Sequence, residues 1–402
     1  MNIGILSRVP NAYSSRRLRE AAAAHGHSAR VFDTLHFSIS VEQQNPGLFY
    51  RGRRIPGLDA VIPRIGASVT FFGLAVVRQF EQMGIYTANQ SIPIARSRDK
   101  LRAMQILCRH NVGIPPTAFV RDKNEVLHAI NRVGGPPVII KVIEGTQGVG
   151  VILAETVEVA EAIVHTLQGV RQNVLVQKFV KESKGRDIRA LVVGDRVVAA
   201  MRRTAFGDEF RSNIHRGATA AAVKLDAAYE ATAIRAAQIL GLRIAGVDML
   251  ESDEGPQVME VNSSPGLEGI EKATNMDVAG EIVKDVEHQV LFPELDLRQR
   301  LRLAAGYGIV ELTVHNLPEL EGKTLRDTDL EERSIHVMMI TRQSEIIPNP
   351  KGDHRIKRGD VLLCYGDLHE LRALMPERKG KRRVRKHFAC PEPTEDVEYP
   401  AD

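Results

Sequence analysis

The sequence predicts a multidomain protein of α/β and α+β class, and three observations support this prediction. Strands and helices alternate through the first 95 residues, which is typical of a parallel sheet covered by helices. A glycine-rich turn lies between two apolar segments near residue 145, and short strands dominate beyond residue 307. A chain of 402 residues has room for roughly two to four domains of about 150 residues each.

The N-terminal elements follow from apolar runs and their boundaries. Strands are expected over 3–6, 29–32 and 59–63, and helices over 14–24, opened by serine caps, and 69–83, closed by Gly84. No G-x-G-x-x-G motif follows the first strand, which argues against a dinucleotide site there.

The middle of the chain contains one helix with clear signals at both ends. It spans 227–240, begins after Asp226, a good N-cap residue, and ends at Gly241. The other expected elements are a helix over 98–110 and strands over 138–142, 149–153, 245–250 and 257–261.

The last third predicts a small β-rich or α+β domain. Strands are expected over 309–314, 334–341 and 361–365, with turn signals between them. The boundary before this domain is expected within 293–306.

Composition excludes several classes of protein. Hydrophobic residues make up 43% and charged residues 26%, as in ordinary globular chains. No apolar run approaches the ~18 residues of a membrane-spanning helix, and residues 1–7 do not resemble a secretory signal. Cys108, Cys364 and Cys390 are scattered, so neither a disulfide framework nor a zinc ribbon is expected. We expect a cytoplasmic protein with no membrane partner.

The charge is uneven along the chain. Residues 378–386 hold seven positive charges and no acid, and without these seven the net charge of +4 becomes −3. Such a run can contact RNA. No aromatic side chain interleaves the charges as a base-stacking surface requires, so we favour a solvated, disordered tail over 377–402.

The glycine-rich turn is a candidate phosphate-binding loop. Gly145, Gly148 and Gly150 provide backbone amides that can close over phosphates. The turn lacks the Gly-Lys-Ser/Thr ending of a P-loop, so by itself a flexible hairpin is the commoner explanation. Lys141 lies on the preceding strand, where it can reach phosphates covered by the turn, and Lys100 is a second candidate.

The two closing strands contain a set of oxygen ligands. Asp248 interrupts an apolar strand, and Glu260 and Asn262, two residues apart, project from one face of the next strand. Carboxylate and amide oxygens suit Mg²⁺, which takes its remaining ligands from water and substrate phosphates. Ordinary polar alternation on a surface strand is the alternative.

Polar side chains also lie between these two regions. Asp187 and Arg189 share a strand face, and Arg211, Ser212 and Asn213 follow in one run. Arginine and asparagine beside a magnesium–phosphate site would stabilise a transferring phosphoryl group. Surface ion pairing is the alternative for each arginine.

Together these motifs resemble the RimK-like ATP-grasp ligases, which add glutamate to the C-terminus of a small-subunit ribosomal protein. The resemblance runs from residue 1 to about 290, with the motifs in matching order. It rests on Lys141, the glycine-rich turn, and the segments QKFV (177–180), ESKGRDIR (182–189), FRSNIHRG (210–217), GVD (246–248) and MEVNSSPGLEG (259–269).

The resemblance implies a pre-ATP-grasp α/β domain over 1–95 and an ATP-grasp fold over 96–292. It implies nucleotide contacts for Lys100, Lys141, the glycine-rich turn and Arg189, an adenine hinge formed by Gln177, Lys178 and Phe179, and ribose contact for Asp187. Arg211, Ser212 and Asn213 match phosphate contacts, and Asp248, Glu260 and Asn262 match magnesium ligands. Lys178 stands where the family usually has an acid, and Ala218 replaces a common glycine.

The mechanism implied by the family needs no covalent enzyme nucleophile. A substrate carboxylate attacks the γ-phosphate of ATP to give an acyl phosphate, and the amine of L-glutamate then displaces phosphate. Catalysis would depend on positioning and on Mg²⁺, with Mn²⁺ as an alternative, while Lys141 and Arg211 neutralise developing charge. The residues do not identify a base for the amine.

Residues 307–376 resemble a second family, the TrkA-C regulatory domains of potassium channels and transporters. The resemblance rests on GKTL (322–325), ITR (340–342) and IKRGDVLL (356–363). It implies that this domain binds a small regulatory ligand or mediates homo-oligomer formation, and docking without a ligand is the alternative.

Two alternative functions stay open at this stage. The enzyme could glutamylate a small molecule or cofactor, since a basic patch of Arg202, Arg203, Arg211 and Arg216 would suit any acidic acceptor. The chain could also be a non-catalytic ATP-sensing regulator, although the complete set of metal ligands argues against this.

Overall fold

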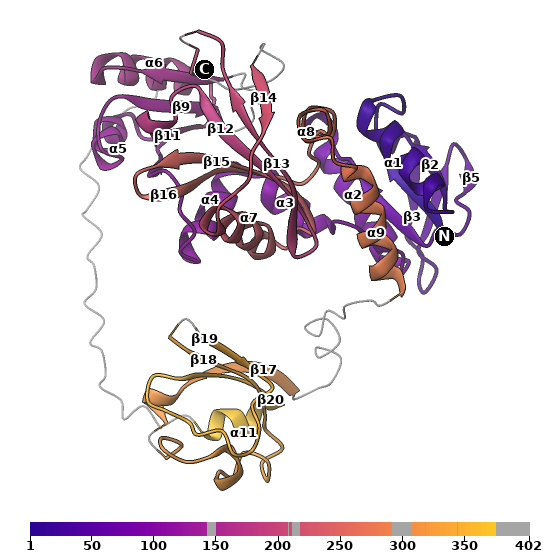
Figure 1. Cartoon of the computed structure of the whole chain (residues 1–402), viewed down its shortest axis with the longest axis vertical. Helices are drawn as coiled ribbons and strands as arrows, with labels where there is room; N and C mark the ends of the chain where they lie inside the picture. The colour runs from indigo at the N-terminus through magenta and orange to yellow at the C-terminus, as the bar shows by residue number, and fades with distance from the viewer. Residues whose placement is uncertain are drawn as a thin grey trace, which may run out of the picture. The chain divides into compact units, whose positions relative to one another are not determined.

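The computed structural model describes residues 1–142, 150–207, 209–210, 218–291, 307–317, 319–343 and 345–374. The chain divides into two compact units, Met1–Pro293 and Glu294–Asp402, and each is described here by itself (Figure 1). No described helix is long and apolar enough to cross a membrane. Cys108 and Cys364 are free thiols, and Cys390 lies outside the described residues.

The first unit begins with a parallel sheet whose strand order is β2-β1-β6-β7. The chain therefore builds outward from β1 to β2, then returns to the other side of β1 to add β6. The strands are β1 (Asn2–Leu6), β2 (Ser28–Phe32), β6 (Ala60–Pro63) and β7 (Tyr86–Thr87), with helices α1 (Tyr13–Ala24) and α2 (Thr70–Gln82) between them. A separate three-stranded sheet is formed by β3 (Phe37–Ser40), β4 (Gly47–Tyr50) and β5 (Arg53–Arg54).

The serines at the start of α1 do not cap it, contrary to the sequence-based expectation. Ala12 occupies the N-cap position and no side chain caps the helix. Both serines are buried, and their hydroxyls make tertiary hydrogen bonds instead of capping the helix. Ser15 donates to the Ser7 hydroxyl at 2.9 Å, and the Ser14 hydroxyl accepts from the Leu267 amide at 3.0 Å.

An antiparallel sheet of order β10-β9-β11-β8 follows, with two helices packed on it. Its strands are β8 (Thr117–Phe119), β9 (Val138–Val142), β10 (Val151–Ala154) and β11 (Val174–Lys178), and its helices are α5 (Val126–Arg132) and α6 (Val157–Gly169). Buried valines and isoleucines on one face of β9 and β11 form its core with these helices.

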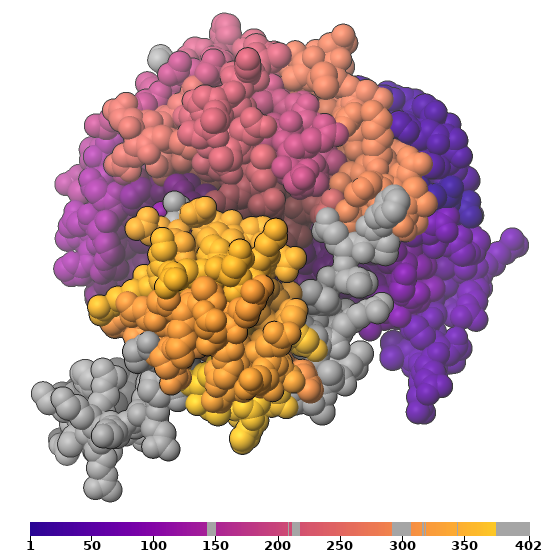
Figure 2. All heavy atoms as spheres, turned by 60° about the horizontal axis from the view of Figure 1, so that its bottom comes forward, coloured from indigo at the N-terminus to yellow at the C-terminus, as the bar shows by residue number. Residues whose placement is uncertain are grey.

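A five-stranded antiparallel sheet of order β14-β13-β12-β15-β16 completes the first unit. Its strands are β12 (Arg186–Val193), β13 (Arg196–Thr204), β14 (Thr219–Ala222), β15 (Ile244–Ser252) and β16 (Gly255–Asn262). The accompanying helices are α3 (Ser91–Arg98), α4 (Lys100–Arg109), α7 (Ala227–Leu240), α8 (Glu268–Thr274) and α9 (Val278–Leu291). Helix α9 packs against α1, so orange and indigo atoms adjoin in Figure 2.

Local sequence signals predicted the ends of one helix correctly and the start of another wrongly. The bounds of α7 are as predicted: Asp226 accepts from the Tyr229 amide at 3.0 Å, and Gly241 is left-handed with φ of 82°. The single helix expected over 98–110 is wrong at its start. Helices α3 and α4 meet at Asp99, whose side chain caps α4 by accepting from the Arg102 amide at 3.0 Å.

The described part of the second unit contains a four-stranded antiparallel sheet of order β17-β20-β18-β19, followed by a short α-helix. It comprises β17 (Tyr307–Thr313), β18 (His336–Arg342), β19 (Glu345–Pro348), β20 (Val361–Asp367) and α11 (Leu368–Ala373). The α+β expectation is confirmed. Strand β19 was missed because it is a short, mostly exposed edge strand without a buried face.

Asn89 joins the N-terminal sheet to the five-stranded sheet. Its buried amide donates to the carbonyl oxygens of Ile244 at 2.8 Å and Ser263 at 3.0 Å. Its carbonyl oxygen accepts from the amides of Arg243 at 3.0 Å and Ile244 at 3.1 Å. One side chain thus fixes the end of β7 against the start of β15 and the loop after β16.

We therefore expect Asn89→Ala to lower the free energy of unfolding of the full chain by about 2–3 kcal/mol, because it leaves buried backbone groups without partners. Urea unfolding followed by circular dichroism measures this loss. Asn124→Ala, at an exposed position, is the control and should change stability by less than about 0.5 kcal/mol. Equal effects of both substitutions would contradict this role for Asn89.

Candidate active site

Strand pairing gathers the predicted site residues on one face of the five-stranded sheet. Asp187 lies opposite Arg203, and Arg189 lies opposite Asp248. Asp248 in turn lies opposite Glu260, and Gly246 opposite Asn262. Because side chains alternate along a strand, the intervening apolar residues fall on the other face, where they pack with α4 and α7.

Two aspartates and two arginines form a buried ion network on this face. Arg203 binds Asp187 through both carboxylate oxygens at 2.6 and 2.5 Å, and contacts Asp248 at 2.9 Å. Arg189 binds both oxygens of Asp248 at 2.7 and 2.6 Å. Asp187, Arg203 and Asp248 are each at most 3% exposed. Paired guanidinium–carboxylate geometry of this kind is strong and directional.

The network keeps Asp248 ionised. Burial alone would raise the pKa of Asp248, but the charges of Arg189 and Arg203 and the hydrogen bonds from them outweigh it and lower the pKa to about 2. Burial likewise opposes the charged form of Arg203, whose pKa is nevertheless raised by Asp248 and Asp187. Asp248 therefore carries a full negative charge at any physiological pH.

Glu260 is an exposed carboxylate at the edge of this face, and it attracts cations from three other elements, α3, α4 and β9. It interacts electrostatically with Arg98, Lys100 and Lys141. The Lys100 ammonium donates to the Val142 carbonyl at 3.4 Å, which links the start of α4 to the end of β9.

Both lysines lose part of their proton affinity through burial. Burial is the largest cause lowering the pKa of Lys141 to about 8, with Lys100 adding to the effect and Glu260 opposing it. Burial also lowers the pKa of Lys100, which Glu260 opposes and Arg98 reinforces. Gly150 directly precedes β10, and its carbonyl accepts from the Val142 amide at 2.9 Å; its φ of 77° and the closeness of Val142 favour glycine there.

The predicted hinge lies at the end of β11. Gln177 is buried and donates to the Thr117 hydroxyl at 2.8 Å, so its side chain fixes β8 against β11. The Lys178 amide donates to the Pro116 carbonyl at 2.9 Å and the Phe179 amide to Pro137 at a longer 3.4 Å. The Lys178 side chain is exposed, 3.9 Å from Glu254.

Asp248, Glu260 and Asn262 suit a cation that completes its shell with water and phosphate oxygens. Among the described residues, no group of three or more His, Cys, Asp or Glu side chains forms a metal cluster. Three hydrogen bonds occupy Asp248, whose carboxylate offers about four acceptor positions, so one remains. Asn262 accepts from the Ser264 amide at 2.9 Å, which orients its oxygen. This set fits Mg²⁺ held by few protein ligands.

Several predicted residues lie outside the described part of the chain. These are Gly145, Gly148, Arg211, Ser212 and Asn213, together with Arg216 of the predicted basic patch and the basic tail. Their roles stay predictions.

The predicted basic patch is wrong at Arg203. Its guanidinium is buried and neutralised by two aspartates, so it is not available to an acidic acceptor. Arg202 is more exposed but pairs with Glu251 at 2.7 Å. Alternation along the strand puts Arg202 and Arg203 on opposite faces, but only the pairing of β13 with β12 shows that Arg203 shares the face of Asp187 and Arg189.

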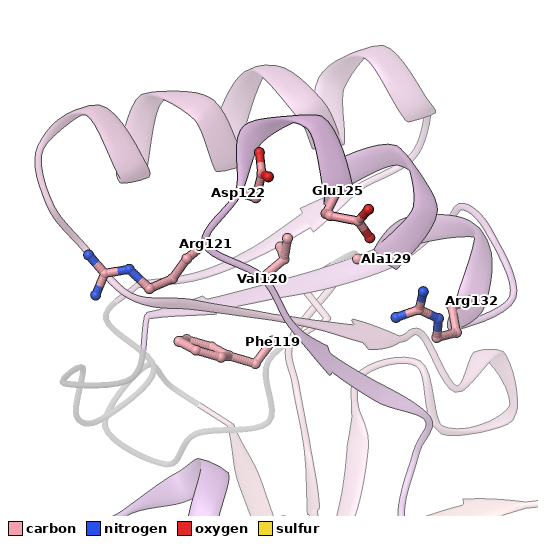
Figure 3. A pocket seen from close by; sticks show the side chains of 7 residues that line it. All are labelled: Phe119, Val120, Arg121, Asp122, Glu125, Ala129 and Arg132. Carbon is pink, nitrogen blue, oxygen red and sulfur yellow. The ribbon is translucent and has the colours of Figure 1, made fainter. Parts of the chain in front are cut away.

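A shallow hollow of about 200 Å³ lies elsewhere, between β8 and α5. Figure 3 shows its seven lining side chains, with Arg121 and Arg132 at opposite ends. None of the predicted site residues lines it.

Arg203→Met should destabilise the chain by about 3–5 kcal/mol, because Asp187 loses the guanidinium that binds both of its oxygens and Asp248 keeps only Arg189. Urea unfolding measures this difference. Arg202→Met, the neighbour on the same strand, whose ion pair with Glu251 is partly open to water, should cost less than about 1 kcal/mol. If the two variants unfold alike, the buried network does not hold this face together.

Comparisons with known proteins agree with this geometry. The family model described as a RimK-like ATP-grasp domain matches residues 97–286, and that of the RimK PreATP-grasp domain matches residues 1–94. The TrkA-C domain model matches residues 309–377.

Two relatives share the name "Probable alpha-L-glutamate ligase". The protein from Rhodopirellula baltica is 57% identical over 392 residues, which cover 98% of this chain and 97% of that relative. The protein from Syntrophotalea carbinolica is 54% identical over 287 residues, 71% of this chain and 95% of the relative.

Solved structures show the same fold at low identity. The ATP-grasp ligase PsnB, complexed with a precursor variant, Mg and ADP, is 22% identical with a TM-score of 0.57, over 71% of this chain and 98% of that one. A RimK domain protein from Sphaerobacter thermophilus is 22% identical with a TM-score of 0.54, over 71% and 100%. The chain belongs to the RimK-like ATP-grasp family and is an ATP-dependent ligase that forms an amide bond.

Proposed function

We propose that this ligase uses ATP and Mg²⁺ to join L-glutamate to the C-terminal carboxylate of a small-subunit ribosomal protein. The relatives named as alpha-L-glutamate ligases support the amino acid, because one of them aligns with nearly the whole chain. The identity of the acceptor, a small-subunit ribosomal protein, rests on the family resemblance alone.

The observation that carries the proposal is the charge arrangement at the edge of the five-stranded sheet. Glu260 and Asn262 lie beside an Asp248 that is held ionised, and Lys100 and Lys141 approach from other elements. An ATP–magnesium complex requires carboxylates that hold the cation and cationic side chains that bind the phosphates. This region of the ATP-grasp fold provides both.

The proposed reaction has two displacements. A carboxylate oxygen of the acceptor attacks the γ-phosphorus, and the bond to the bridging oxygen breaks, releasing ADP and leaving an acyl phosphate. The deprotonated amine of glutamate then attacks the acyl carbon. Phosphate leaves, the nitrogen loses its second proton, and an amide remains.

The chain's own residues position these reactants. Lys141 and Lys100 would bind phosphate oxygens. Asp248, Glu260 and Asn262 would hold Mg²⁺, which when bound neutralises phosphate charge. Mn²⁺ is an alternative because it shares the preference for oxygen ligands. Arg189 and Arg203 are positioning residues, since they fix the Asp248 carboxylate. Adenine would lie at Lys178 and Phe179, and the predicted phosphate contacts of Arg211–Asn213 would complete the site.

The second unit is proposed to regulate the enzyme, by binding a small ligand or by forming a homo-oligomer. The Syntrophotalea relative aligns over 95% of its own length with only 71% of this chain, which is close to the length of the first unit. A relative of the same name thus has little room for a counterpart of the second unit, which supports our proposal that the first unit carries the ligase chemistry.

The test is mass spectrometry of a peptide ending in the ribosomal protein's acidic C-terminus, incubated with enzyme, ATP, Mg²⁺ and L-glutamate. Stepwise mass increases of one glutamate residue are expected, with one ADP formed per residue added. ADP formation with an unchanged peptide would move the acceptor to another molecule, such as a small cofactor.

Glu260→Gln should lower the rate of glutamate addition by at least about 100-fold, because it removes the exposed carboxylate proposed to hold Mg²⁺. The initial rate of peptide modification at saturating ATP measures this. Glu42→Gln, at an exposed position between β3 and β4, is the matched control and should keep full activity. A Glu260→Gln enzyme as fast as this control would remove Glu260 from the site.

ATP affinity should fall as pH rises through the Lys141 pKa of about 8, because only the protonated ammonium attracts phosphate. If the charged form alone binds, the dissociation constant increases about tenfold between pH 7 and pH 9. Titration calorimetry at both pH values measures it. Lys141→Arg keeps its charge and should flatten the dependence; an unchanged slope in that variant would rule out Lys141 as its origin.

A further inference from the structure

The carboxyl edge of the N-terminal parallel sheet carries two arginines that the proposed ATP and Mg²⁺ contacts do not use. Arg64 directly follows β6, and its amide continues the pairing by donating to the Leu6 carbonyl at the end of β1 at 2.8 Å. Strands β1 and β6 are neighbours in the order β2-β1-β6-β7, where the chain changes direction across the sheet. In open parallel sheets, ligands bind outside the carboxyl ends of the strands at this switch point.

The second guanidinium reaches the same place from the end of α3. Arg98 donates a hydrogen bond to the carbonyl of Ile65, the residue after Arg64. Both side chains are half-buried, and the Nε of Arg98 is buried without a hydrogen-bond partner. Burial and then the charge of Arg98 lower the pKa of Arg64 to about 10, so the two cations repel each other at short range.

No carboxylate within the described ranges forms an ion pair with Arg64 or Arg98. Several other half-buried or buried arginines of this unit behave differently: Arg189, Arg203 and Arg243 each bind a carboxylate through two nitrogens. Burying like charges without partners is unfavourable for folding, so the fold by itself does not explain this pair.

The start of α2 favours an anion at the same edge. This 13-residue helix follows Arg64 after residues 65–69, of which Ala67–Val69 form a 3-10 turn, and it has neither a capping side chain nor an acidic residue in its first turn. The Val69 amide donates to Gly66 and the Thr70 amide to Ala67, so the helix dipole rather than free amides attracts an anion here.

This edge adjoins the proposed reaction centre. Arg98 lies two residues before Lys100, and Glu260 attracts both. Asn89, at the same edge of the sheet, holds the Ser263 carbonyl at 3.0 Å, one residue after Asn262. An anion bound by the two arginines would therefore lie close to the proposed ATP and Mg²⁺ contacts.

We propose that Arg64 and Arg98, with the start of α2, bind a carboxylate of one of the two glutamate-bearing reactants, either the acceptor C-terminus or the incoming L-glutamate. This inference rests on the proposed ligase function and names the residues that would recognise its carboxylate substrates. The planar fork of a guanidinium matches a carboxylate with two parallel hydrogen bonds.

The test uses the full chain with Arg64→Met and Arg98→Met, and Arg78→Met on the exposed side of α2 as the matched control. KM is measured separately for L-glutamate, acceptor peptide and ATP. We expect KM for one carboxylate substrate to rise at least about tenfold in both site variants, with KM for ATP within about twofold of wild type. A rise for glutamate identifies the amine donor, and a rise for the peptide identifies the acceptor.

Thermal unfolding separates a binding role from a structural one. Removing an unpaired, half-buried charge should leave the Tm of Arg64→Met equal to or above that of wild type, and Arg64→Lys should recover part of the affinity. Unchanged KM values for both carboxylate substrates, a rise for ATP alone, or a clear fall in Tm would each overturn the proposal.

Direct binding distinguishes failure of this inference from failure of the proposed function. Titration calorimetry with L-glutamate and with the acceptor peptide, in the presence of ADP and Mg²⁺, needs no turnover. If wild type joins no glutamate yet binds one of these ligands and Arg64→Met does not, the function fails and the carboxylate site stands. If neither ligand binds wild type, or both bind all variants equally, the site is refuted.

Discussion

The buried contact between Arg203 and its two aspartates is the interaction on which the active face depends. It joins β12, β13 and β15 through side chains that are almost fully withdrawn from water. Charges in such a place are tolerated only when they are paired and hydrogen-bonded. The pairing fixes the Asp248 carboxylate, and through strand register it also fixes where Glu260 and Asn262 emerge on β16.

A charge gradient extends from this buried network to the N-terminal sheet. Asp248 is neutralised by its arginines, whereas Glu260 faces Arg98, Lys100 and Lys141. Arg64, directly after β6 in the N-terminal sheet, forms no ion pair with a carboxylate in the described part of the chain. The region is therefore positively charged where phosphates and carboxylates would meet, and this excess of cations suits a ligase whose reactants are all anions.

Sequence patterns predicted much of the fold because its elements have strong local signals. Helix α7 has an N-cap aspartate and a C-terminal glycine, and both perform as predicted. Signals failed where tertiary contacts used the same residues differently. Ser14 and Ser15 make tertiary hydrogen bonds instead of capping α1, and Asp99 caps α4, which therefore begins at Lys100 and not at the predicted residue 98. The domain bounds of 1–95, 96–292, 307–376 and 377–402 stay predictions.

The sequence by itself determined which residue types lie on each strand face, because side chains alternate with a period of two. That was enough to put Asp187 with Arg189, and Glu260 with Asn262. Only the tertiary structure decided that Arg203 is a buried partner of Asp187 and Asp248, while its neighbour Arg202 turns away to pair with Glu251. Register between strands far apart in sequence, such as Arg189 opposite Asp248, is a long-range property. No local pattern encodes it, because it emerges when the sheet and its core assemble together.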